Sequence, residues 1–243
     1  MAMPFYVPPE QAMKDRADYA RKGISRGKSV VAVTYAEGVL FVAENPSATL
    51  HKISEIYDRI GFAAVGKYNE FEQLRVAGIR MADVKGWQYA RDDVNGRTLA
   101  NAYAQALGGA FTESSKPYEV ELLIAEVTDT GVELYHILYD GSITDEDDYV
   151  AIGGSAEAIN GALAERFRPA GSMEEALQVA CGALAVAEER GAPAQRLEVA
   201  GLDRTRARRK FFRLEPDEVA AVLGEGHTRP QTAAPAQGRD AAG

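Results

Sequence analysis

The sequence predicts a single-domain α+β fold of four layers (αββα), in which two antiparallel β-sheets pack face to face and pairs of helices cover their outer faces. Strand-like runs come in blocks that do not alternate one-for-one with helices, which argues against a doubly wound parallel sheet. Two pairs of segments with helical spacing of apolar residues separate these blocks. Nearly every strand run is apolar at successive positions, as expected where both faces of a sheet are covered. The 243 residues, 46% of them hydrophobic, are enough for a substantial core.

The N-terminal third begins with one helix and continues with strands. A helix is predicted over residues 9–22, because Pro9 suits a first helical turn, Glu10 favours the positive N-terminal end, and Lys22 favours the other end. Strands follow at 29–36 and 38–45, with Glu37-Gly38 as the hairpin turn between them. Two further strands are predicted at 52–58 and 60–66, so four strands precede the first core helix.

After residue 67 the spacing of apolar residues becomes helical. Further along the chain, segments with strand spacing and segments with helical spacing follow one another. A capping box of Ser172 and Glu175 marks the start of one helix. The elements predicted after residue 67 are helices at 68–90 and 97–111, strands at 118–127, 132–139 and 148–154, helices at 155–167 and 172–190, strands at 196–203 and 210–215, and a short helix at 216–224. Residues 225–243 have almost no bulky apolar side chains and are predicted to be a disordered tail.

Composition and charge exclude several classes of function. The net charge of −9 argues against general nucleic-acid binding, and the basic stretch 204–210 fits a solvated hairpin tip between two strands. No apolar run reaches the length of a membrane span, and the N-terminus lacks the features of a signal peptide. The lone Cys181 cannot form a disulfide within the chain, so we expect a cytoplasmic protein. His51, His136 and His227 show no metal-ligand spacing, and we expect no cofactor.

The stretch GISRGKS (23–29) resembles a phosphate-binding loop only superficially. A Walker A loop has four residues between its glycines, whereas Gly23 and Gly27 enclose three. Such a loop also runs from a strand into a helix, and here a predicted helix precedes a predicted strand. The stretch therefore fits a helix end followed by a turn into the first strand.

Several segments resemble the proteasome family, which has the Ntn-hydrolase fold, and they occur in the family's order over residues 5–224. VTYAEGVLFVAENPS (33–47) resembles the first hairpin, HKISEIYDRIGFAAVG (51–66) the following strand pair, and KPYEVELLIAEV (116–127) the opening of the second sheet. DGSITDEDDYVAIGGSAEAINGALAERF (140–167) resembles the strand and helix beyond it. FYVPPEQAMKDRADYARKGISRGKS (5–29) resembles the N-terminal extension of alpha subunits of actinobacterial type.

The resemblance implies an alpha subunit without catalytic residues of its own. Beta subunits of the family use an N-terminal threonine as the nucleophile, freed by cleavage before the first strand. The position of that threonine corresponds here to Lys28, which has no hydroxyl group, while Glu44 corresponds to an acidic residue of the beta subunits. The alternative is a self-processing Ntn hydrolase with Ser29 as its N-terminal nucleophile. A third possibility is a regulatory binding domain that does not form rings.

Lys52 is the principal binding residue that the resemblance implies. In alpha rings the corresponding lysine lies in a pocket between neighbouring subunits and takes the C-terminal carboxylate of an activator, a role for which a cation is suited. By position alone, Arg26, Gly27 and Gly66 are further candidates for this activator-docking pocket.

The N-terminal residues are candidates for a gate, because in alpha rings these segments converge on the pore and close it. Phe5, Tyr6, Val7, Pro8 and Pro9 would form it. The expected organisation is therefore a flexible gate segment (1–8), an alpha-type helix and linker (9–27), the αββα domain (28–224) and the disordered tail (225–243).

The function that the resemblance implies is entry control for a proteolytic chamber. The chain would form heptameric rings on a ring of proteasome beta subunits, dock a ring-shaped ATPase through its C-termini, and pass unfolded protein substrates inward. In the actinobacterial form these substrates carry a small protein tag, Pup, which the ATPase reads. Neither nucleic acid nor a membrane is an expected partner.

Overall fold

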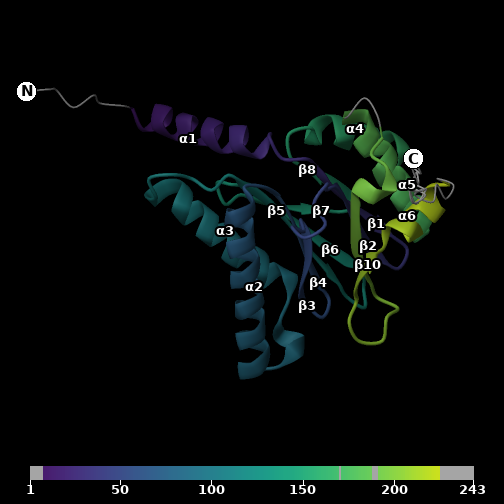
Figure 1. Cartoon of the computed structure of the whole chain (residues 1–243). Coiled ribbons are helices and arrows are strands. Elements are labelled where there is room, and N and C mark those ends of the chain that lie inside the picture. The colour runs from purple at the N-terminus through teal and green to yellow at the C-terminus, as the bar shows by residue number, and fades with distance from the viewer. Residues whose placement is uncertain (1–7, 170, 188–190, 225–243) are drawn as a thin grey trace, which may run out of the picture.

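The computed structural model describes residues 8–169, 171–187 and 191–224, and within them the predicted four-layer arrangement is confirmed. Two five-stranded antiparallel sheets form the middle layers, in the strand orders β10-β9-β2-β1-β8 and β3-β4-β5-β6-β7. Figure 1 shows α2 and α3 beside one sheet, and α4, α5 and α6 beside the other. The helix α1 projects away from the end of the sandwich (Figure 1).

The elements follow the predicted order closely. The helices are α1 (Pro9–Ile24), α2 (Tyr68–Gln88), α3 (Gly96–Glu113), α4 (Ala156–Arg166), α5 (Met173–Ala187) and α6 (Pro216–Leu223), with short 3-10 turns η1 (Arg91–Asp93) and η2 (Ala194–Arg196). The strands are β1 (Val30–Tyr35), β2 (Gly38–Glu44), β3 (Ile53–Tyr57), β4 (Ile60–Gly66), β5 (Val120–Val127), β6 (Val132–Ile137), β7 (Ile143–Glu146), β8 (Tyr149–Ile152), β9 (Leu197–Asp203) and β10 (Phe211–Leu214).

Strand β2 shows why these strands are apolar at successive positions. Val39, Phe41 and Ala43 point into the core between the two sheets, whereas Leu40 and Val42 point toward α4, α5 and α6. Both faces are therefore covered, and all seven residues are buried. A third core lies between α2, α3 and the second sheet, with Phe62 and Leu107 among its members.

Two predictions of local structure need correction. The first hairpin turns at Ala36-Glu37 and not at Glu37-Gly38, because Gly38 already pairs with Tyr35 as the first residue of β2. The backbone of β9 passes so close that a Cβ atom at Gly38 would lie 1.8 Å from the carbonyl oxygen of Leu202. The edge strand β7 was not predicted, because its sequence ITDE is short and acidic.

The capping box and the basic hairpin tip are confirmed. The backbone N–H of Ser172 donates to the carboxylate of Glu175 over 2.8 Å, and the N–H of Glu175 donates to Ser172 Oγ over 3.2 Å. Residues 204–209 are exposed between β9 and β10. No helix within the described ranges is long and apolar enough to cross a membrane.

Candidate functional site

The segment between α1 and β1 contains Lys28, the residue that the resemblance aligns with the nucleophile of beta subunits. The Nζ atom of Lys28 lies 3.2 Å from a carboxylate oxygen of Glu44, whose other oxygen lies 2.6 Å from Arg196 Nη2. Glu44 is buried at the end of β2. Its charge is thus balanced by two cations, an arrangement suited to holding β2, the segment before β1 and η2 together.

Ser29, the candidate nucleophile of the alternative hypothesis, lies inside the fold. It is only 7% exposed. Gly153 packs against it, since a Cβ atom on Gly153 would lie 3.1 Å from Ser29 Oγ. Ser29 is therefore covered by its own chain in the full-length protein.

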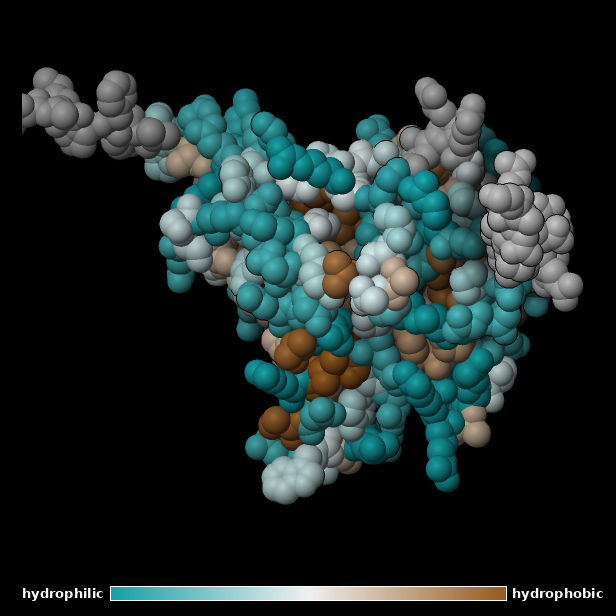
Figure 2. All heavy atoms as spheres, viewed as in Figure 1, coloured by the Kyte–Doolittle hydropathy of each residue, from teal (hydrophilic) through white to brown (hydrophobic). Residues whose placement is uncertain are grey.

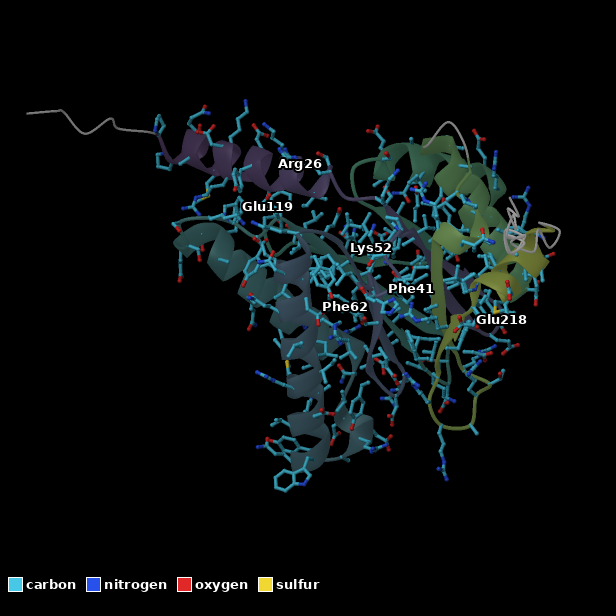
Figure 3. The ribbon with its side chains drawn as sticks, viewed as in Figure 1. Arg26, Phe41, Lys52, Phe62, Glu119 and Glu218 are labelled. Atoms are coloured by element: carbon cyan, nitrogen blue, oxygen red, sulfur yellow. The ribbon has the colours of Figure 1, made fainter. Side chains whose placement is uncertain are left out.

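Lys52 precedes β3 and reaches back toward the same segment. Its ammonium group donates hydrogen bonds to the backbone carbonyl oxygens of Lys28 over 2.7 Å and of Glu44 over 3.2 Å. Its own carbonyl oxygen accepts from the N–H of Ala64 on β4. Lys52 is therefore fixed between the two sheets at their common end, below the end of α1 where Arg26 lies (Figure 3).

The structure brings Gly27 and Gly66 together beside this lysine. A Cβ atom on Gly27 would lie 2.8 Å from Val65 Cγ1 and 3.3 Å from the backbone nitrogen of Gly66. Gly66 has a φ of +119°, a conformation that other residues rarely adopt, and its backbone passes directly over Glu119. Arg26 is exposed next to them. Arg26 and Gly27 thus lie between α1 and Lys28, and Gly66 joins them from the end of β4.

A cluster of charges beside Gly66 was missed in the sequence. Lys116 Nζ lies 2.5 Å from Glu70 Oε1 and 2.8 Å from Glu119 Oε1, and Lys67 lies 3.8 Å from Glu119. Burial acts to lower the pKa of Lys116, but the hydrogen bonds to Glu119 and Glu70 outweigh it and raise that pKa. In the sequence, only the Lys-Pro-Tyr segment at 116–118 indicated this cluster. That Lys116 pairs with a residue of α2 could not be predicted, because the two are brought together only by the fold.

The predicted gate falls mostly outside the described residues. Phe5, Tyr6 and Val7 lie outside them, whereas Pro8 immediately precedes α1 and Pro9 is its first residue. The helix is attached to the domain by Arg16, whose Nη1 atom donates to the carbonyl oxygen of Phe111, and by the buried Ala20. Ala20 therefore packs within its own chain, while Tyr19 stays 49% exposed.

The C-terminal half of α2 carries exposed apolar side chains. Val84 is 53% exposed, Trp87 86%, and Tyr89, just beyond the helix, 74%. Figure 2 shows hydrophobic side chains gathered over the lower part of α2, at the opposite end of the molecule from α1. Exposed apolar groups concentrated at one end mark a surface suited to contact another protein.

The described residues hold no group of three or more histidine, cysteine, aspartate or glutamate side chains placed to bind a metal ion. Cys181 on α5 is half-buried and packs against the core.

Comparison with known proteins gives a consistent result. A family model described as proteasome subunit matches residues 24–200. The chain is 57% identical to the proteasome subunit alpha of Streptosporangium roseum over 237 residues, which cover 96% of this chain and 92% of that protein. It is also 57% identical to the proteasome subunit alpha of Thermobifida fusca (93% of this chain, 92% of that one) and of Thermomonospora curvata (93% and 100%).

Proposed function

Because this chain belongs to the proteasome subunit family, and within it to the alpha subunits of actinobacterial type, we propose that it is the non-catalytic subunit that controls entry to the proteolytic chamber. Seven copies form an outer ring on a ring of proteasome beta subunits. The ring admits unfolded, Pup-tagged cytoplasmic proteins when a ring-shaped ATPase docks its C-termini.

The observation that carries the docking proposal is the position of Lys52. Its ammonium group is held by two backbone carbonyl oxygens, at the end of the sandwich where Gly27 meets Gly66. A cation fixed in this way can take the carboxylate at the end of a partner chain, because little side-chain freedom remains to be lost on binding. Arg26, Gly27 and Gly66 line the same end as further members of the pocket.

The absence of catalysis is supported by the residues at the nucleophile's position. Lys28 has no hydroxyl group and its ammonium group pairs with Glu44, and Ser29 is buried in the fold. Residues 1–8, including Phe5 to Pro8, act as the gate together with Pro9, the first residue of α1. The exposed face of α2 meets the beta ring.

Native mass spectrometry of the chain, alone and co-expressed with a beta subunit, tests this proposal together with denatured intact mass. Uncleaved chains in sevenfold rings, or in a larger particle with beta subunits, are the expected result. A monomer that lacks residues 1–28 and begins at Ser29 would overturn it in favour of a hydrolase. A full-length monomer under all conditions would favour a binding domain that does not form rings.

A further inference from the structure

A buried carboxylate joins the two sheets beside Lys52. Glu198 lies on β9 and is only 7% exposed. On the same strand Ala200 and Leu202 point into the core between the sheets, and Glu198 occupies the corresponding inward position at the strand's end. A charge buried in such a place is costly unless several donors satisfy it.

The donors of Glu198 come from the connection between β2 and β3. One carboxylate oxygen accepts from the backbone N–H of Lys52 over 2.9 Å and from Asn45 Nδ2 over 2.7 Å. The other accepts from the backbone N–H of Ile53 over 3.1 Å and from Arg213 Nη1 over 2.8 Å, and it lies 3.3 Å from His51 Nδ1. Residues 51, 52 and 53 all face this one carboxylate.

Two of these donors, Asn45 and Arg213, also form hydrogen bonds with backbone carbonyl oxygens of the connection between β2 and β3. Asn45 Nδ2 also donates to the carbonyl oxygen of Leu50 over 2.7 Å, and Arg213 Nη2 donates to the carbonyl oxygen of Ile53 over 2.7 Å. The path of the chain into β3 is therefore fixed on both sides of Lys52. Burial acts to raise the pKa of Glu198, but the hydrogen bonds from Lys52, Asn45 and Arg213 outweigh it and hold the pKa below its ordinary value, so the carboxylate stays charged.

We propose that Glu198 is a positioning residue for activator docking, which fixes the backbone of Lys52 so that its ammonium group stands at the pocket. The proposal rests on the docking role of Lys52 given above. The two ends of this lysine are held separately: its backbone by Glu198, and its ammonium by the carbonyl oxygens of Lys28 and Glu44. A binding group must be held by its surroundings in the geometry that its ligand needs.

Glu126 supplies a matched control within the chain. It is also a buried carboxylate, 2% exposed, that accepts from a backbone N–H (Gly96, 2.6 Å) and from an arginine (Arg59 Nε, 2.6 Å). It lies on β5 and pairs with Ile60 at one end of β4, whereas Gly66 lies at the other end of β4. Glu126→Gln therefore reproduces the general cost of neutralising a buried, hydrogen-bonded carboxylate without touching Lys52.

The test uses the assembled particle of alpha and beta subunits and the proteasomal ring ATPase of the same organism. The ATPase concentration that gives half-maximal stimulation of peptide hydrolysis is measured for Glu198→Gln, Glu126→Gln and Lys52→Ala. Amide hydrogen exchange over residues 45–53 is followed in parallel. We expect Glu198→Gln to raise that concentration about tenfold, the size of effect of losing hydrogen bonds to a charged group, and to speed exchange. Glu126→Gln should change neither.

The outcomes separate this inference from the docking role itself. If Lys52→Ala abolishes stimulation and Glu198→Gln leaves it at the wild-type level, the positioning role is overturned and the docking role stands. If Lys52→Ala has no effect, both are overturned. Should Glu198→Gln fail to assemble, Asn45→Ser removes one donor without changing the charge. It should raise the half-maximal concentration and the exchange rate in the same direction, and wild-type values for both would overturn the inference.

Discussion

The ammonium group of Lys52 lies 2.7 Å from the backbone carbonyl oxygen of Lys28, the residue that the family resemblance aligns with the nucleophile of beta subunits. The side chain of Lys28 turns instead to Glu44. Lys52 and Glu44 are the lysine and the acid that the resemblance aligns with the catalytic arrangement of beta subunits; here Lys52 contacts main-chain oxygens and Glu44 is paired with cations. Lys52 is thereby a fixed cation at the end of the sandwich.

Replacing Lys52 by alanine should abolish activation by the ATPase while leaving the particle assembled. The reason is that the carboxylate at the activator's C-terminus loses its cationic partner, at a cost of about 2–5 kcal/mol. Lys210→Ala is the matched control, because the ammonium group of Lys210 also donates to two backbone carbonyl oxygens, those of Arg204 and Arg206, in the β9–β10 loop. ATPase-stimulated peptide hydrolysis checks this, and equal stimulation of both variants would contradict it.

Deleting residues 1–8 should raise the hydrolysis of small peptides severalfold in the absence of an activator, because the proposed gate is removed while α1 keeps its start at Pro9. Degradation of a folded protein should remain dependent on the ATPase. The control is deletion of residues 225–243 at the other end of the chain, which should leave basal peptide hydrolysis unchanged. An unaltered basal rate after the N-terminal deletion would refute the gate.

Two equally exposed valines test which face meets the beta ring. Val84 on α2 is 53% exposed and Val186 on α5 is 51% exposed. Val84→Asp should weaken assembly with beta subunits by about tenfold or more, since a charge in the desolvated centre of an interface is costly. Val186→Asp should assemble normally. Native mass spectrometry over a range of subunit concentrations measures both, and an effect confined to Val186→Asp would reverse the assigned face.

The stability contributed by Glu198 should depend on pH in a defined direction. Its pKa is lowered in the folded state, so its contribution is fully present above the ordinary glutamate pKa of about 4.3 and is lost as the pH falls through the lower, folded-state pKa. At neutral pH, Glu198→Gln should lower the free energy of unfolding by about 2 kcal/mol relative to the wild type. Below the folded-state pKa the two should converge, because a protonated glutamate resembles glutamine. Urea unfolding of both proteins at several pH values checks this, and a gap that stays constant into acid would disprove it.

The sequence predicted the layers well because strand β2 and its neighbours are apolar at most successive positions, which is a local property. It predicted less of the site, because the partners there are distant in the chain: Glu198 contacts Lys52, Asn45 and Arg213, and Lys116 contacts Glu70. A charged residue inside an otherwise apolar strand, as in RLEVAGLD, is a signal for such a cluster. The partners of that residue cannot be identified from the sequence, because they depend on the pairing of β9 with β2 and on the position of β3 beside them.

Gly66 should be among the least replaceable residues of the pocket. Alanine there would have to adopt a φ of +119°, and its Cβ atom would lie 1.9 Å from the carbonyl oxygen of Glu119, a backbone atom that cannot move aside. Strain and overpacking together should lower the free energy of unfolding by about 3 kcal/mol or more. Gly161→Ala is the control, because Gly161 lies inside α4 with nothing within 4 Å of a Cβ atom, and this change should stabilise the chain by about 0.5–1 kcal/mol. Thermal unfolding of the two variants decides the matter: equal melting temperatures would mean that β4 can end without the conformation that brings Gly66 against Gly27.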